Sequence, residues 1–250
     1  MDAGNLADFK THLTVTSIAG CIASTVLLAA SLASPQEVLL YFIMALVGGL
    51  LPDIDSDGSL PVRLLFTFMA TIIAFLVMFR QRTDGSAMEL LIIWGGSFAV
   101  IKFFVFSMFA RITVHRGMIH SVPAALMFGF GGTILLHRVF HFETFTVWMA
   151  GLFLFFGYVL HLLLDEICSL GFLGRPAKRS AGTALKFASF TDMKATLFVY
   201  AAAAMLFFIT PDHRPFFRTV LDAETYEHLE IFPRGGWFKA LYRDYIAGLK

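Results

Sequence analysis

Residues 145–165 read FTVWMAGLFLFFGYVLHLLLD, and this stretch decides the class of the fold. It is a run of about twenty mostly apolar residues, long enough for one helix to cross a lipid bilayer. His161 and Asp165 lie four positions apart near its end, so both side chains leave the same face of that helix. Placing a carboxylate in or beside hydrocarbon costs free energy unless the carboxylate contacts a partner, a metal or water. The stretch therefore predicts a spanning helix that forms one wall of a buried polar site.

The composition of the whole chain is that of an integral membrane protein. Of its 250 residues, 58% are hydrophobic and only 15% are charged, whereas a soluble domain is roughly half apolar and about a quarter charged. The net charge of +1 does not indicate a nucleic-acid partner. The two cysteines, Cys21 and Cys168, form no metal-binding or disulfide pattern. We therefore expect membrane lipids, and no nucleic acid, among the partners of the protein.

Seven apolar runs predict an all-α, polytopic helical bundle with six or seven transmembrane helices. They cover residues 13–33, 38–51, 62–79, 88–110, 118–136, 145–164 and 195–209. The second and seventh runs are the shortest. Residues 1–210 are thus expected to form one membrane-embedded domain. Residues 211–250 form a polar tail, in which 237–249 are expected to make an interfacial helix.

The loop cations predict the orientation of the bundle. Those on the side of the N-terminus are Lys10, Arg63, Arg111, Arg116, Arg175, Lys178, Arg179, Lys186 and Lys194. Short loops on the other side carry only Arg80, Arg82 and Arg138. The positive-inside rule then places the N-terminus in the cytoplasm, although Arg214 and Arg218 in the tail favour the opposite orientation for the last span.

The candidate site residues share one face of the predicted membrane. Odd-numbered spans begin, and even-numbered spans end, on the same face. The residues at those positions are His12 before span one, Asp53 and Asp55 after span two, His115 after span four, His120 at the start of span five, and His161 and Asp165 at the end of span six. All seven can therefore meet at one depth, near the cytoplasmic boundary.

The pair His161 and Asp165 allows two interpretations. The histidine can simply donate to the carboxylate at a helix end, where polar side chains often reach for water. Alternatively, an imidazole nitrogen and a carboxylate oxygen one turn apart suit a divalent metal. Glu166 leaves the helix about 100° away from Asp165, so it can act only from beside the ligands.

The stretch LPDID at residues 51–55 places Asp53 and Asp55 two apart after a helix-ending proline. In extended backbone alternate side chains point the same way, so both carboxylates can reach one site. The alternative is a solvated loop. A calcium-binding EF-hand loop is excluded, because its twelfth position requires glutamate and Leu64 stands there.

The string HRGMIHS at residues 115–121 is the most specific local motif. His115 and His120 are five apart and do not share a helical face, so the chain must bend, which Gly117 permits. Ser121 can cap the following helix. The alternative is an ordinary basic connector, and Arg116 can either bind an anionic substrate group or pair with a carboxylate.

Two basic features of the sequence each allow two interpretations. The loop 171–194 can lie on anionic lipid headgroups, or part of it can fold over the site and bind phosphate. Lys102, inside the fourth apolar run, can extend its ammonium to the interface or pair with a carboxylate of the site.

Four motifs, in order, resemble a known family. They are His12, LPDID at 51–55, HRGMIHS at 115–121 and GYVLHLLLD at 157–165, with SAGTALKF at 180–187 as a further similar stretch. Together they resemble the bacterial inner-membrane metal-dependent hydrolases, the YdjM-like family, which is distantly similar to zinc-dependent phospholipase C and P1-type nucleases. Ile119 departs from the threonine that members of the family often have. The resemblance implies His12, Asp53, His115, His120, His161 and Asp165 as metal ligands, with Asp55 beside them.

The sequence thus predicts a metal-dependent hydrolase in the bacterial inner membrane, acting at the cytoplasmic boundary on a phosphoester of a lipid or lipid-linked substrate. The expected cofactor is zinc, or manganese, as one or two ions, because four histidines and three carboxylates exceed the needs of one tetrahedral zinc. Asp55 or Glu166 is the expected general base. The expected substrate-binding residues are Arg116, Lys178 and Arg179.

The alternative is a non-enzymatic metal-binding membrane protein, either a carrier or a protein with a structural metal site. Carriers usually hold their ligands near the middle of the membrane, between discontinuous helices. A structural site is fully coordinated and leaves no position open for substrate.

Overall fold

The computed structural model describes residues 4–55, 60–80, 86–105, 120–169, 185–189, 192–227 and 229. In these ranges the chain is helical and has no strand, apart from one isolated bridge between Ser121 and Lys186. The elements are α1 (Gly4–Ala29), α2 (Pro35–Leu50), η1 (Pro52–Asp55), α3 (Leu60–Arg80), α4 (Ala87–Ala99), η2 (Val100–Val105), α6 (Val122–Arg138), α7 (Thr144–Ser169), α8 (Met193–Ile209), α9 (Arg214–Leu221) and η3 (Ala223–Tyr226). The predicted all-α class is therefore confirmed for the described residues.

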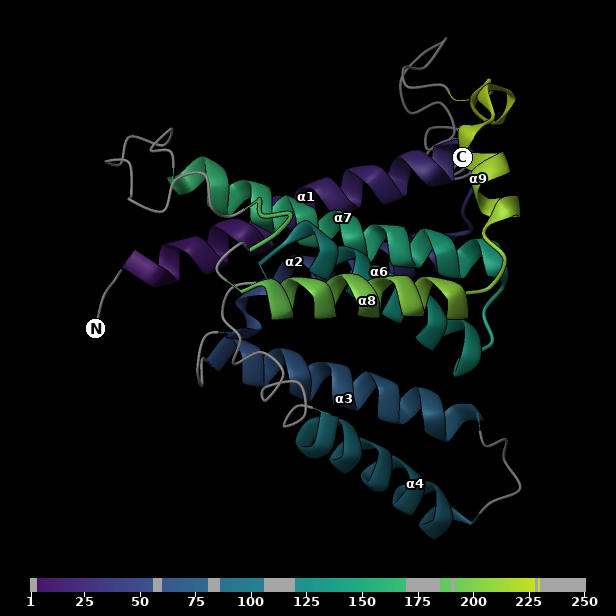
Figure 1. Ribbon diagram of the computed structural model, residues 1–250. Helices are drawn as coiled ribbons and strands as arrows, with labels where there is room; N and C mark the ends of the chain where they lie inside the picture. Colours follow the sequence, from purple (N-terminus) through teal and green to yellow (C-terminus); the bar gives the residue numbers. More distant parts are fainter. Residues whose placement is uncertain are drawn as a thin grey trace, which may run out of the picture.

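Helix α7, which contains the apolar stretch 145–165, lies at the centre of the bundle (Figure 1). Helices α2 and α6 pack along it, α1 packs on α2, and α8 packs on α6. Half of the residues of α7 are buried, and its side chains form much of the apolar core together with those of α2 and α6. Helices α3 and α4 pack on each other and lie to one side of this bundle (Figure 1).

Glycines bring α2 and α7 unusually close together. A side chain at Gly48 would collide with the backbone carbonyl of Leu154, and one at Gly157 would collide with that of Ala45. Small residues allow helix backbones to approach in this way, and such contacts drive association where lipid removes the hydrophobic effect between helices. The close approach places the C-terminal end of α2 directly beside the last turns of α7.

Several helices are long and apolar enough to cross a membrane. Among the described residues these are Lys10–Ala29, Ala87–Phe104 and Thr144–Ser169, with Met193–Ile209 and Arg214–Leu221 as a fourth span if this pair, bent by 94°, counts as one. The apolar stretches Pro35–Leu50 and Ala70–Phe79 are shorter. The structure therefore supports three to four candidate spans, and the six or seven expected from the sequence stay a prediction.

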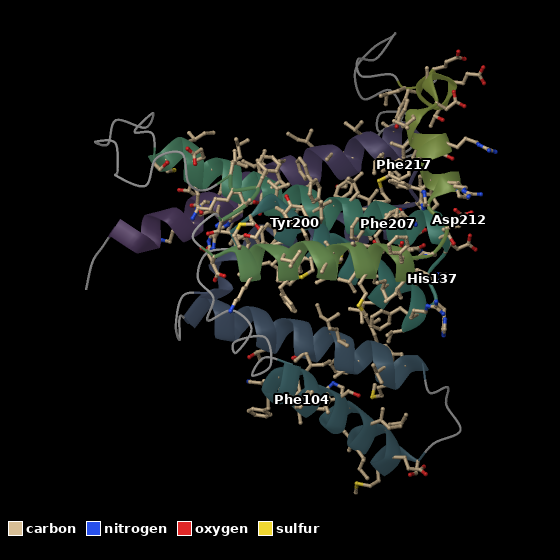
Figure 2. All side chains as sticks on the ribbon, in the orientation of Figure 1. Phe104, His137, Tyr200, Phe207, Asp212 and Phe217 are labelled. Atoms are coloured by element: carbon tan, nitrogen blue, oxygen red, sulfur yellow. The ribbon has the colours of Figure 1, made fainter. Side chains whose placement is uncertain are left out.

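The outer surface of these helices carries large apolar side chains, as expected of a surface in contact with lipid. Phe104 at the end of the α4–η2 helix is 67% exposed and Phe208 on α8 is 84% exposed. Figure 2 shows Phe104 pointing outward from its helix.

The tail begins with a sharp turn between α8 and α9, near the labelled side chains of Phe207, Asp212 and Phe217 (Figure 2). Trp148 of α7 holds this turn, because its indole Nε1–H donates to the Pro211 carbonyl at 3.1 Å. Phe216 of α9 is buried against the Trp148 ring. The interfacial helix expected at 237–249 lies outside the described residues.

Candidate metal site

His161 of α7 is fixed by the end of α2. Its Nδ1 lies 2.7 Å from the carbonyl oxygen of Gly49, which is in the last turn of that helix. Carbonyls in a last turn lack a partner within their own helix and are free to accept. Because a carbonyl can only accept, Nδ1 must carry the proton of the bond. In the neutral ring Nε2 is then the acceptor nitrogen, with its lone pair pointing away from α2.

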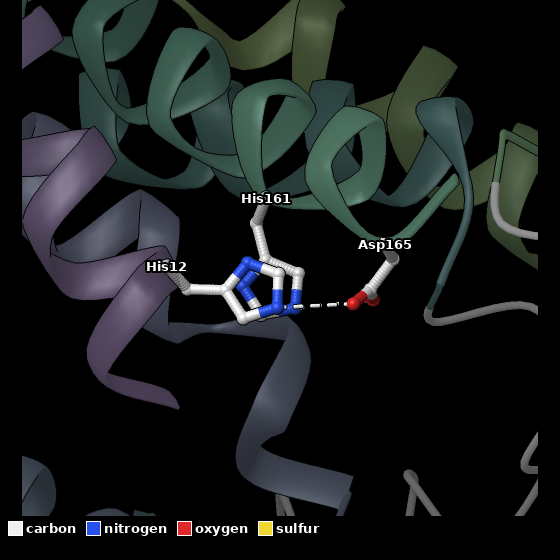
Figure 3. Close-up of side chains that lie close together, drawn as sticks. All are labelled: His12, His161 and Asp165. Atoms are coloured by element: carbon white, nitrogen blue, oxygen red, sulfur yellow. Dashed lines mark ion pairs between the residues drawn. The ribbon is translucent and has the colours of Figure 1, made fainter. Parts of the chain in front are cut away.

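His12 of α1 lies directly against His161. The two rings stack with centroids 3.9 Å apart and planes 16° apart (Figure 3). Both side chains are almost completely buried. Thr16, one turn after His12, packs against Gly49 where a larger residue than glycine would collide with it. The same end of α2 therefore positions both histidines.

Two carboxylates complete the cluster. Asp165, one turn after His161, places Oδ1 at 3.0 Å from His12 Nε2 and Oδ2 at 3.3 Å from His161 Nε2 (Figure 3). Asp53 of η1 places Oδ1 at 3.5 Å from His161 Nε2. The buried residues Leu51 and Pro52 hold η1 at the end of α2. Both carboxylates are about one-third exposed, so the cluster is closed on its histidine side and more open on its carboxylate side.

The separations between ligand atoms fit a coordinated metal. With metal–ligand bonds of about 2.0–2.2 Å, neighbouring ligands lie roughly 3.4 Å apart in a tetrahedral site and roughly 3 Å apart in an octahedral one. The three nitrogen–oxygen separations are 3.0, 3.3 and 3.5 Å. His12, His161 and Asp165 each offer a ligand atom, and these three atoms all lie within 4.8 Å of one another. This donor set of imidazole nitrogen and carboxylate oxygen suits zinc or manganese.

The strongest indication of a metal site is the Nε2 atom of His161. This buried nitrogen makes no hydrogen bond to any described atom, although oxygens of Asp53 and Asp165 lie nearby. A lone pair facing two carboxylate oxygens is electrostatically repulsive, and a buried polar atom without a partner requires an explanation. Protonation of Nε2 would reduce the repulsion, but the geometry is not that of a hydrogen bond. A divalent cation bound among these atoms would remove the repulsion and would accept the lone pair.

The other residues expected at the site divide into two groups. His120 lies beside the cluster, its ring centroid 6.3 Å from that of His161. Glu166 is half-buried on α7, next to Asp165. The residues His115, Arg116, Lys178 and Arg179, and the side chain of Asp55, lie outside the described part of the structure.

Two elements of the site were not anticipated from the sequence. The Gly49 carbonyl orients His161, and the adjacent pair Gly48-Gly49 just before the LPDID motif is the signal that could have indicated it. The second element is the pairing of the segment 185–189 with Ser121, because the sequence allowed the loop 171–194 to fold over the site without indicating where it would attach. Its local sequence carries no signal of that pairing.

Comparison with known proteins gives one result. A family model described as YdjM inner membrane protein matches residues 8–221. No curated protein and no solved structure matches the chain. The chain therefore belongs to the YdjM inner membrane protein family, as its motifs predicted, and the family description together with the apolar helices identifies an inner membrane protein. The distant similarity to phospholipase C and P1-type nucleases stays a prediction.

Proposed function

We propose that this member of the YdjM family is a metal-dependent hydrolase that cleaves a phosphoester of a lipid or lipid-linked substrate. The observation that carries the proposal is the buried Nε2 of His161, which faces carboxylate oxygens of Asp53 and Asp165 while Gly49 holds Nδ1. Four potential ligands from three separate parts of the chain converge there. Such convergence of costly polar groups beside a membrane is typical of a functional site.

The described residues that would hold the metal are His12, His161, Asp53 and Asp165. We expect zinc, with manganese as the second candidate. His120, together with His115, would hold a second ion if two are bound. When bound, the metal supplies Lewis acidity and lowers the pKa of a coordinated water towards neutrality, as in hydrolases generally.

The chain's own residues have distinct roles in this hydrolysis. Gly49 keeps His161 in the tautomer whose Nε2 is free to bind, an arrangement on which ligand strength often depends. The buried ring of His12 excludes water from the closed side. Asp55 or Glu166 is the proposed base that takes the proton of the attacking water as the phosphorus–oxygen bond to the leaving group breaks. Arg116, Lys178 and Arg179 are proposed to bind the substrate's anionic group.

The location of the cluster suits a lipid substrate. His161 and Asp165 lie near the C-terminal end of α7, so the site would be at a membrane boundary and not in the middle of the bilayer. A lipid headgroup can reach such a site by lateral diffusion. We further propose that six or seven helices cross the membrane, and that the N-terminus and the cluster face the cytoplasm.

The test is phosphoester hydrolysis by purified protein in detergent, with phosphatidic acid, phospholipids and lipid diphosphates as substrates and with zinc or manganese supplied. The wild type is compared with Asp165→Asn and with the control His137→Gln, whose ring lies at the far end of α6 and contacts the Phe142 carbonyl. We expect activity in the wild type and the control, and its loss in Asp165→Asn. Equal activity in Asp165→Asn and the wild type would refute the proposal. Metal binding without hydrolysis of any of these substrates would favour the carrier or structural alternative.

A further inference from the structure

The segment 185–189, which we call the strap, is tied to the start of α6 beside the metal cluster. The Val122 N–H donates to the Lys186 carbonyl at 3.0 Å, and Lys186 pairs with Ser121 in a parallel bridge. Ser121 is fully buried and caps α6 through the Ala124 N–H. His120, whose ring lies beside that of His161, immediately precedes Ser121. The backbone of Lys186 therefore lies against Ser121, the residue that follows His120.

The other end of the strap is tied to α8. The Ser189 N–H donates to Thr196 Oγ1 at 3.0 Å, and the Thr196 hydroxyl lies 3.1 Å from the Ser189 carbonyl. The Tyr200 hydroxyl donates to the Phe187 carbonyl at 3.0 Å, and Figure 2 shows Tyr200 on α8. With bonds to two helices, the strap has a defined position relative to the cluster.

The strap packs against the core close to the site. Leu185 contacts a core cluster that includes Leu51 and Leu162. These two residues are close neighbours in sequence of Asp53 and His161. Lys186 is the next residue of the strap, is half-buried and pairs with Ser121. Its flexible four-carbon stem lets the ammonium extend from this backbone position near the cluster.

The Lys186 ammonium has no ion-pair partner among the described residues. None of the described carboxylates forms an ion pair with it, whereas Asp165 is within 3.3 Å of two histidines. A lysine whose backbone lies near the candidate metal site is suited to bind phosphate oxygens there as a point charge. The Lys186 ammonium would balance negative charge on phosphate oxygens that a metal does not bind.

We propose that Lys186 binds the phosphate group of the substrate. This inference rests on the proposed function and adds a substrate-binding residue to it. Phosphate can be presented by a lipid headgroup or by a soluble molecule, and the chemistry recognised by Lys186 is the same in both.

The test uses the full-length, zinc-loaded protein in a detergent without phosphate. Calorimetric titrations with inorganic phosphate, and separately with phosphatidic acid in mixed micelles, compare the wild type with Lys186→Gln and Lys186→Arg. Lys194→Gln is the matched control, because Lys194 is exposed on the first turn of α8 and carries the same charge. Zinc content per chain is measured for each variant.

We expect Lys186→Gln to weaken phosphate binding by about tenfold or more, the usual scale for a lost charge-assisted hydrogen bond. Lys194→Gln should stay within about twofold of the wild type and Lys186→Arg should keep most of the affinity, because the cation remains. All variants should hold as much zinc as the wild type. Binding of phosphatidic acid alone would identify a lipid headgroup as the source, and binding of free phosphate as well would indicate a soluble or released phosphate.

Equal phosphate affinity in Lys186→Gln and the wild type would overturn the inference. So would a zinc-loaded wild type that binds neither phosphate nor phosphatidic acid, and that result would leave the metal site itself standing. A wild type that binds no zinc refutes the proposed function instead. The ratio of phosphate affinities between Lys186→Gln and the wild type still decides the role of Lys186 in that case.

Discussion

The two ends of the contact between α2 and α7 both carry carboxylates, but their surroundings differ. At the end away from the cluster, Glu37 accepts hydrogen bonds from the Ser34 N–H at 2.8 Å, the Ser34 hydroxyl at 2.7 Å and the Thr146 hydroxyl at 2.5 Å. At the other end, Asp53 and Asp165 face the acceptor nitrogen of His161.

The two ends differ in how the surrounding protein satisfies the carboxylates. Glu37 forms a capping box with Ser34 at the start of α2 and ties that helix to α7, so donors of the protein account for its charge. At the cluster end, Asp165 lies 3.0 Å from His12 Nε2, but Asp53 and Asp165 also face His161 Nε2, which makes no hydrogen bond to the described residues. In the proposed function, a bound cation would balance that arrangement.

The largest effect should come from removing one carboxylate at the cluster end. We expect Asp165→Asn to lower zinc affinity by more than about a hundredfold, because even groups that merely support a ligand cost roughly ten- to a hundredfold when lost. The matched change at the other end, Glu37→Gln, should leave zinc affinity unaltered. Competition with a zinc chelator measures both affinities, and similar losses in the two variants would remove the distinction between the ends.

A smaller but more general effect should follow from separating α2 and α7. Gly157→Ala places a methyl group against the Ala45 carbonyl, and we expect the free energy of unfolding to fall by about 3 kcal/mol, the upper end for overpacking. Gly131→Ala is the control, since nothing lies within 4 Å of a side chain there. Thermal unfolding in detergent measures both. Equal melting temperatures for the two variants would show that the close approach is not required.

The smallest effect is expected at the end away from the cluster. Thr146→Val removes one hydrogen bond to Glu37, and we expect the free energy of unfolding to fall by about 1.5–2 kcal/mol, as for other bonds to charged groups. Zinc content should not change. A loss of zinc in this variant would mean that the two ends of the α2–α7 contact are coupled.

The sequence predicted much of the fold and part of the site. The apolar run at 145–164 marks α7, and the position of polar residues at the ends of runs placed His12, Asp53 and His161 on one face, where the structure also brings them together. Apolar periodicity and side-chain type suffice for such inferences. The number of six or seven spans stays a prediction, since three or four of the described helices are long and apolar enough to cross a membrane.

Other features could not be predicted from the sequence, because they depend on backbone atoms or on pairing between residues far apart in the chain. The Gly49 carbonyl orients His161, yet every residue has a carbonyl, so no side-chain pattern marks the one that accepts. The bridge between Ser121 and Lys186 joins residues far apart in the chain. The π-helix at Val100–Val105, which contains Lys102, interrupts a run that read as one regular helix. There Lys102 lies over the Phe98 ring, 5.3 Å from its centroid.

X-ray absorption at the zinc edge of the zinc-loaded wild type tests the central claim most directly. We expect nitrogen and oxygen neighbours at about 2.0–2.1 Å, with the outer-shell scattering of two imidazole rings. In His161→Ala this imidazole signal should fall or the zinc should be lost. A wild-type spectrum like that of hydrated zinc, without imidazole scattering, would contradict the claim that His12 and His161 hold a metal.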